Sequence, residues 1–182
     1  MLYYIAQAIG LAAFCVAVAS FQKNSQKGIL TFQLVSSTLF CLHFALLGAS
    51  VGAMLNAIAA VRAFVFSNKE KAWARSRFWL VFFTLLCAAA GIFTWENGFS
   101  ILPILGMAFT TAAFWIEDPA MVRRVSFPSS PCWLIYNAVH HSWAGVMTEV
   151  FVMCSSLVAM WRYEWRPGLH ARRTGTQKER QQ

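Results

Sequence analysis

Seven apolar stretches, separated by short polar or charged connections, cover almost the whole of this chain. They are Leu2–Phe21, Ile29–Leu47, Val51–Phe66, Phe78–Phe93, Ser100–Ile116, Val125–His140 and Ala144–Trp161. As α-helices of roughly 16 to 20 residues they can cross a hydrocarbon layer about 30 Å thick. The pattern predicts an all-α integral membrane protein with seven transmembrane helices, forming a single domain over residues 1–164.

The basic residues all lie on one side of this seven-helix arrangement. Fourteen of the 15 Lys and Arg residues occupy the connections and the tail on that side, namely residues 22–28, 67–77, 117–124 and the segment from Arg162 onward. The other, Arg62, is about one turn from the same end of the third helix, where we expect its side chain to extend to a phosphate headgroup. The opposite connections contain no Lys or Arg. Because positive loops stay in the cytoplasm, we expect the N-terminus outside and the C-terminus inside.

Composition agrees with this assignment. The chain is 58% hydrophobic and only 12% charged, and its mean hydropathy of +0.53 is too high for a soluble domain of this size. The net charge of +8 lies beside the membrane, where anionic lipids attract it. We therefore expect the lipid bilayer, and not nucleic acid, as the partner of the basic segments. The tail, residues 165–182, has no apolar periodicity and is expected to be disordered in the cytoplasm.

Two stretches of the chain resemble each other at a constant offset of 93 residues. SSTLFCLHFALLGASVGAMLN, which begins at Ser36, aligns with SSPCWLIYNAVHHSWAGVMTE, which begins at Ser129. Within this alignment His43 corresponds to Tyr136 and Asn56 to Glu149. The first three helices and the last three also start on the same side. We therefore predict a parallel repeat of three-helix bundles, 3–66 and 99–162, joined by a linker helix over 78–93 in a 3+1+3 order.

At these residues the chain resembles two related groups of membrane proteins. The 3+1+3 order is similar to the SWEET and PQ-loop superfamily of small-solute transporters. The segments LLGASVGAMLN from Leu46 and WLIYN from Trp133 more closely resemble the YgjV-type bacterial inner-membrane proteins, over about residues 3–163. The resemblance implies a location in the bacterial inner membrane. The YgjV-type family implies no reaction, because it has no established substrate.

The chain departs from the transporter pattern in its prolines. SWEET-type proteins have prolines on the first two helices of each repeat, and these act as hinges. No proline precedes Pro103 here, whereas Pro103, Pro128 and Pro131 fall in or beside the fifth and sixth helices. The PQ dipeptide is also absent. Bending is therefore expected in the second repeat only.

The resemblance also implies a substrate pocket in the middle of the membrane. SWEET-type transporters line it with an Asn on the third and on the seventh helix and with aromatic residues of the second and sixth. By position these are Asn56, Glu149, Phe40 and Trp133, with a carboxyl in place of an amide at Glu149. A carboxyl at that depth usually faces a partner or a cavity. It could bind a cationic or hydroxylated solute, or carry a proton.

Helical spacing adds one further residue to this set of candidates. Asn137 lies four positions after Trp133, so both share one face of the sixth helix. This face of the sixth helix is expected to point to the inside of the bundle. Asn137, like Tyr136 and His43, could equally serve as a hydrogen-bonding contact between helices.

Enzymatic chemistry finds no support in the sequence. A zinc protease needs an H-E-x-x-H helix, and the five cysteines form no CxxC pair. His140, His141 and Glu149 are too few and too widely spaced for a convincing metal site. We expect no enzyme, no metal and no cofactor.

Two functions remain open. A small-solute transporter is favoured by the repeat and by the Asn56 and Glu149 pair, whereas a non-transporting scaffold or assembly protein is favoured by the missing hinges. A central cavity lined by the candidate residues would favour the first, and a filled bundle the second. The sequence does not determine the substrate or the oligomeric state.

Overall fold

Apolar sequence becomes helix throughout the part of the chain that the structure describes. The computed structural model describes residues 1–20, 26–113 and 119–161. Within these ranges the chain forms eight α-helices and one short 3-10 helix and no strand. They are α1 Leu2–Ser20, α2 Gln26–Leu47, α3 Ser50–Ser67, α4 Phe78–Phe93, η1 Gly98–Ser100, α5 Ile101–Ala113, α6 Pro119–Ser126, α7 Ser129–Val139 and α8 Trp143–Met160. The expected disordered tail, residues 165–182, lies outside the described residues.

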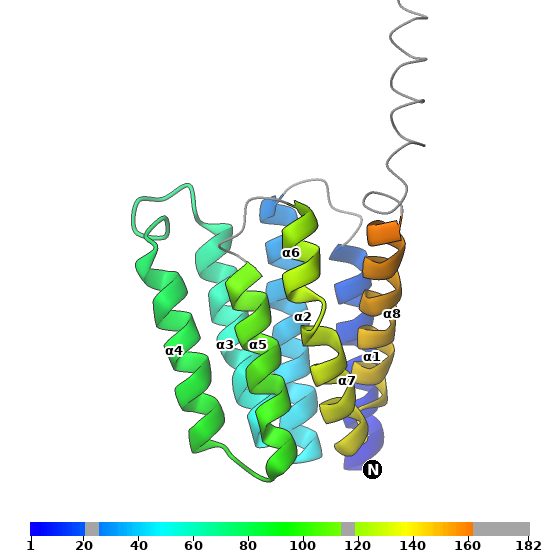
Figure 1. The fold of residues 1–182 in the computed structure, drawn as a ribbon. Helices are drawn as coiled ribbons and strands as arrows, with labels where there is room; N and C mark the ends of the chain where they lie inside the picture. Colours follow the sequence, from blue (N-terminus) through cyan, green and yellow to red (C-terminus); the bar gives the residue numbers. More distant parts are fainter. Residues whose placement is uncertain (21–25, 114–118, 162–182) are drawn as a thin grey trace, which may run out of the picture.

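The helices run up and down in one bundle (Figure 1). The N-terminus and the turns that follow α2, α4 and α7 lie at one end, called here the N-terminal end. The connection between α3 and α4, which carries Lys69, Lys71, Arg75 and Arg77, lies at the other, called here the basic end. The end of α8 also lies at the basic end.

Contacts between helices follow the same order in the first and last parts of the chain. Helix α2 packs against both α1 and α3, and α7 packs against both α5 and α8. The two groups meet where α1 contacts α8 and where α3 contacts α5. Helix α4 packs against α3 and α5 at the outside of the bundle (Figure 1).

The turns after α2 and α7 close with the same backbone hydrogen bonds. The N–H of Ala49 donates to the carbonyl of Phe44 over 2.9 Å, and the N–H of Ser142 donates to that of Asn137 over 2.8 Å. In both turns the next helix then starts within two residues, α3 at Ser50 and α8 at Trp143. Phe44 and Asn137, like Ala49 and Ser142, are 93 residues apart.

One of the seven expected spans is not a continuous helix, and the others differ in length. Helices α1, α3, α8 and the Lys27–Leu47 part of α2 are long and apolar enough to cross a membrane. Phe78–Phe93 and Gly98–Ala113 are shorter apolar helices. The expected sixth span, Val125–His140, is wrong as one helix, because it is divided between α6 and α7.

Proline chemistry explains this division. Pro128 lacks a backbone N–H, and its ring collides with the turn before it, so it stops a helix that would otherwise continue from α6. It begins α7 instead, with a φ of −62° that suits a first helical turn. The expected loop 117–124 is also partly helical, because α6 begins at Pro119.

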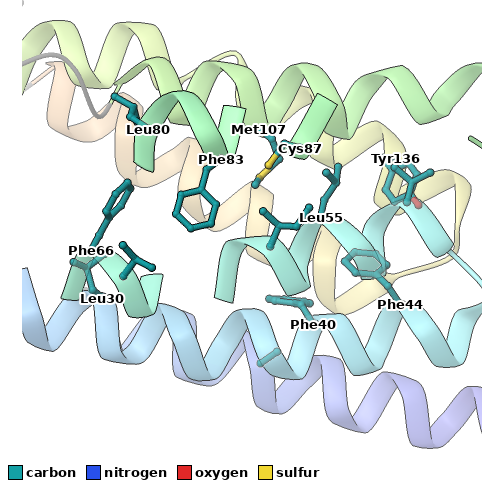
Figure 2. Packing of buried hydrophobic residues seen from close by; sticks show 14 of the residues in the cluster. Leu30, Phe40, Phe44, Leu55, Phe66, Leu80, Phe83, Cys87, Met107 and Tyr136 are labelled. Carbon is teal, nitrogen blue, oxygen red and sulfur yellow. The ribbon is translucent and has the colours of Figure 1, made fainter. Parts of the chain in front are cut away.

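Helix α4 is held by a single apolar stripe. Its buried residues Leu80, Phe83, Cys87 and Gly91 recur every three or four positions and therefore share one face. Phe83 packs edge-on against Phe66 of α3, with ring centroids 5.9 Å apart, and Figure 2 shows this layer between α4 and α3. The other residues of α4 are largely exposed, as expected for a helix that faces lipid.

Candidate functional site

A cavity of about 450 Å³ lies between the first three helices and the last four. Helices α1 to α3 line one side, and α5 to α8 line the other, while α4 contributes no residue among those described. The cavity extends from Asn137 and Gly145, near the N-terminal end, to Leu30 and Phe66, within about a turn of the basic end. Its polar and charged lining residues are Gln33, Ser36, Ser37, Asn56, Arg62, Thr110, Ser126, Ser129, Ser130, Asn137, Thr148, Glu149 and Ser156.

All five residues predicted to bind substrate line this one cavity. Phe40 comes from α2, Asn56 from α3, Trp133 and Asn137 from α7, and Glu149 from α8. Asn56 and Glu149 are each the seventh residue of a helix that starts at the N-terminal end. With a rise of 1.5 Å per residue, both lie about 9 Å along their helices. The structure thus brings the candidate residues together without testing whether they bind a solute.

Among the described residues, Glu149 is the acidic residue of the cavity wall. Among the described residues, the side chain that interacts with its carboxyl is the hydroxyl of Ser130, which can donate a hydrogen bond to it. Ser130 is itself buried on α7. A hydroxyl neutralises no charge, and a carboxylate can accept about four hydrogen bonds. Glu149 therefore retains capacity to bind a donor from the cavity.

Two of the amides that line the cavity, Asn56 and Asn137, differ in their hydrogen bonding. The Nδ2 of Asn56 donates to the carbonyl of Gly52, one turn earlier on α3, over 2.9 Å. Asn137 is only 2% exposed, and its Oδ1 is buried without a hydrogen-bond partner in the described part of the chain. This oxygen lies directly against Gly145 of α8, where a Cβ would collide with it. The position of the Asn137 side chain therefore depends on the absence of a side chain at Gly145. Asn137 also lines the cavity.

Aromatic rings form a wall of the cavity that the sequence predicted only in part. Phe44 packs between Phe40 of its own helix and Trp133 of α7, with ring centroids 6.1 and 6.2 Å apart. All three residues line the cavity. Phe44 was not a candidate in the sequence, although its spacing of four from Phe40 puts both rings on one face of α2.

Three of the described side-chain hydrogen bonds cross between the halves beside the N-terminal end, and one of them joins Nε2 of Gln7 on α1 to the carbonyl of His141 over 2.7 Å. The hydroxyl of Tyr136 on α7 accepts from the N–H of Gly52 on α3 over 2.9 Å. The Nε2 of His43 on α2 lies 2.7 Å from the hydroxyl of Ser142, just before α8. The Nδ1 of His43 faces the carbonyl of Ala6 at 2.7 Å. Because a carbonyl only accepts, Nδ1 carries the proton and Nε2 accepts from Ser142.

Two of the crossing bonds involve equivalent side chains, although their partners, Ser142 and Gly52, are not equivalent at the offset of 93. His43 and Tyr136 are equivalent at the offset of 93, and each reaches the start of the third helix of the other half. Both side chains are fully buried. The sequence allowed both residues as hydrogen-bonding contacts between helices, and these bonds confirm that interpretation, but the sequence did not indicate that they bridge the halves.

Glu96 lies in the connection between α4 and α5 and contacts the start of α3 at the same end of the bundle. Its Oε1 accepts from the N–H groups of Ser50 and Val51, the second over 3.3 Å. An acidic side chain here satisfies the free N–H groups at the start of α3 and complements the helix dipole. Its Oε2 lies 3.5 Å from Nε2 of His140. His140 thus contacts Glu96, whereas the partner of Glu149 is Ser130.

Arg62 corrects an expectation from the sequence. Instead of extending to a headgroup, its side chain lines the cavity, and Nη1 donates to the hydroxyl of Thr111 on α5 over 2.8 Å. Thr111 is 1% exposed, so the bond lies inside the bundle. The guanidinium therefore links the two halves near the basic end.

Comparison with known proteins places this architecture in a family. Residues 4–166 match the family Imp-YgjV, described as bacterial inner membrane protein. The chain belongs to the YgjV family of bacterial inner-membrane proteins. A relative, "Inner membrane protein YgjV" of Escherichia coli (strain K12), is 27% identical over 170 residues, which cover 90% of this chain and 88% of the relative. No solved structure gave a significant match.

Membership in the YgjV family establishes the location of the protein but not its activity. The family description names the inner membrane and no substrate, reaction or partner. Any function must therefore be inferred from the cavity.

Proposed function

We propose that this protein transports a small polar solute across the inner membrane through the cavity between its two halves. The observation that carries the proposal is that Phe40, Asn56, Trp133, Asn137 and Glu149 line one cavity of about 450 Å³. This volume lies within the range of small-molecule sites. A bundle that served only as a scaffold would gain nothing from a cavity of this size, because each missing contact costs packing energy.

The proposal includes the 3+1+3 repeat and its relation to SWEET and PQ-loop transporters. The turns after α2 and α7 have equivalent hydrogen bonds at the offset of 93, and His43 and Tyr136 cross reciprocally between the halves. A parallel repeat generates such pairs, because its halves are related by an axis along the membrane normal. The moving units would then be residues 3–66 and 99–162.

The conformation described here corresponds, in this proposal, to the cavity open towards the cytoplasm. The lining reaches the basic end at Leu30 and Phe66, and the positive-inside rule assigns that end to the cytoplasm. At the opposite end the Tyr136–Gly52 and His43–Ser142 bonds tie the halves together. Opening to the outside would require these bonds to break, together with that from Gln7 to the His141 carbonyl.

One feature favours the alternative of a non-transporting scaffold. Helix α2 runs unbroken over Gln26–Leu47, whereas its counterpart is interrupted between α6 and α7 at Phe127 and Pro128. A transport mechanism in which both halves bend would need a hinge in each, and the first half has no such break in α2. We therefore propose that movement is confined to the second half, where α6 can turn relative to α7.

Access to the cavity from each side of the membrane tests the proposal without knowledge of the substrate. Thr148 lines the cavity and its hydroxyl bonds only within its own helix, to the carbonyl of Ala144. In a chain whose native cysteines are replaced, Thr148→Cys should react with an impermeant thiol reagent applied to either side of proteoliposomes.

The matched control is Thr84→Cys. Thr84 makes the same type of bond, to the carbonyl of Leu80, but it faces outward on α4 and should react from neither side. Labelling of Thr148→Cys from one side only, at every temperature at which the protein remains folded, would exclude transport and favour the scaffold.

A further inference from the structure

Glu149 is the acidic group among the described residues that line the cavity, and no ion pair is found for it within that part of the chain. The partner that the described residues give it is the neutral hydroxyl of Ser130. A carboxylate at membrane depth is costly unless a partner or water stabilises it. The free hydrogen-bonding capacity of this carboxyl points into the cavity that a solute would occupy.

Arg62, the basic residue of the same lining, is engaged elsewhere. It donates to Thr111 on α5, and it lies six residues beyond Asn56 on α3. Six residues of helix separate the two levels by about 9 Å. Since Asn56 and Glu149 are both the seventh residue of their helices, Arg62 lies about that much nearer the basic end than the carboxyl.

The remaining surroundings of Glu149 also favour a cation. Phe40, Phe44 and Trp133 form the aromatic wall of the cavity, and ring faces attract positively charged groups. Oxygen atoms that can accept hydrogen bonds are supplied by the hydroxyl of Ser130 and the side chain of Asn56. A carboxylate, neutral oxygen acceptors and ring faces together match an ammonium group.

We propose that the cavity binds small primary amines, with the protonated amino group at Glu149 and the body of the molecule against Phe40, Phe44 and Trp133. This inference rests on the proposed function and names the substrate class of the same site. A primary ammonium offers three N–H donors and so uses the carboxylate and its neighbouring oxygen acceptors together. A neutral alcohol of the same shape lacks the charge, and a carboxylic acid is repelled by Glu149.

Four probes of nearly one shape separate these possibilities. Tyramine carries a primary amine, tyrosol a hydroxyl in its place, 3-(4-hydroxyphenyl)propionate a carboxylate, and N,N,N-trimethyltyramine a cation without N–H donors. Binding to the full-length protein in lipid nanodiscs is measured by isothermal titration calorimetry. We expect tyramine to bind about 10- to 100-fold more tightly than tyrosol, the range of a charge-assisted hydrogen bond.

Substitution of Glu149 tests whether the preference for tyramine over tyrosol depends on the carboxyl group. In Glu149→Gln, tyramine should bind no more tightly than tyrosol, while the glutamine oxygen can still accept from Ser130. In Glu149→Asp, which keeps the charge, the preference for tyramine should persist. The matched control Glu70→Gln makes the same change in the exposed connection after α3 and should leave all four affinities unchanged.

Each opposite result overturns the inference. Equal binding of tyramine and tyrosol, or a preference for tyramine that survives Glu149→Gln, would exclude the carboxyl as an amine site. Equal binding of tyramine and its trimethyl analogue would assign the cavity to cations in general and not to primary amines. Failure to bind tyramine together with two-sided labelling of Thr148→Cys would reject the amine and keep transport. Tyramine binding with one-sided labelling would keep the site and reject transport.

Discussion

Gly48 and His141 adopt the same left-handed backbone conformation, with φ of 74° and 52°, at equivalent positions of two turns. Gly48 lies in the turn after α2 and His141 in the turn after α7, and each directly precedes the residue that closes its turn, Ala49 or Ser142. Glycine takes this conformation freely, but a side chain that carries a Cβ does so at a cost of about 1–2 kcal/mol. The second turn therefore has the same backbone shape as the first, although His141 is less favourable than glycine in this conformation.

Substitution of Gly48 by alanine and of His141 by glycine should affect the stability of the protein differently. Gly48→Ala should destabilise the protein by about 1 kcal/mol, because nothing lies within 4 Å of the new Cβ and the cost is confined to the backbone. His141→Gly should be neutral or stabilising by up to about 1 kcal/mol, since relief of strain is offset by a more flexible unfolded chain. The bond from Gln7 to the His141 carbonyl is unaffected. Thermal unfolding in detergent measures both, and equal losses would contradict the shared turn conformation.

Tyr136→Phe should loosen the N-terminal end of the bundle. It removes the acceptor of the Gly52 N–H, and a buried donor without a partner costs about 1–3 kcal/mol. We expect faster amide hydrogen exchange at the start of α3. Tyr4→Phe is the matched control, because Tyr4 is 76% exposed on α1, and its exchange pattern should equal that of the parent. Unchanged amide hydrogen exchange at Gly52 in Tyr136→Phe would show that this bond does not stabilise the N-terminal end of the bundle.

The positive-inside rule predicts the orientation of the bundle. Gly98→Cys, where a Cβ meets nothing within 4 Å, should react with an impermeant reagent in spheroplasts. Lys71→Cys, in the exposed connection at the basic end, should react only after permeabilisation. The reverse pattern would place the N-terminal end in the cytoplasm.

The helices were largely predictable because bilayer spanning needs long apolar runs. The expected Val51–Phe66 appears as Ser50–Ser67, and Phe78–Phe93 appears unchanged. The break between α6 and α7 was expected only as a bend, because the apolar residues on either side of Pro128 were read as one helix although residues 126–131 are mostly serine and proline. Backbone geometry at a proline decides such a boundary, and hydropathy does not record it.

The candidate site was predictable in its members but not in their partners. Position within the repeat selected Asn56 and Glu149, and both line the cavity. The contact of Glu96 with the start of α3 joins residues 46 positions apart, and it depends on how one loop folds over a helix end. No period or motif in the sequence encodes such a contact. The bond from Arg62 to Thr111 likewise arises only once α3 and α5 are packed together.

The equivalence of Asn56 and Glu149 leads to a test in which the charge is moved across the cavity. Both side chains line the cavity from opposite halves, and both are the seventh residue of their helices. If amine binding depends on a carboxylate at this depth, its position in the first or the second half should matter little. Asp has nearly the shape of Asn, so Asn56→Asp changes charge with little change in packing.

The double variant Asn56→Asp/Glu149→Gln should therefore recover tyramine binding that Glu149→Gln alone loses. Because the aspartate is shorter than the original glutamate and lacks Ser130 as a neighbour on its own side, we expect affinity within about tenfold of the parent rather than equal to it. Asn56→Asp alone, with two carboxylates facing one cavity, should bind tyramine at least as tightly as the parent. Calorimetry with tyramine and tyrosol measures all three variants. A double variant as weak as Glu149→Gln would mean that the carboxyl acts only in its contact with Ser130, and that the two halves are not interchangeable at the site.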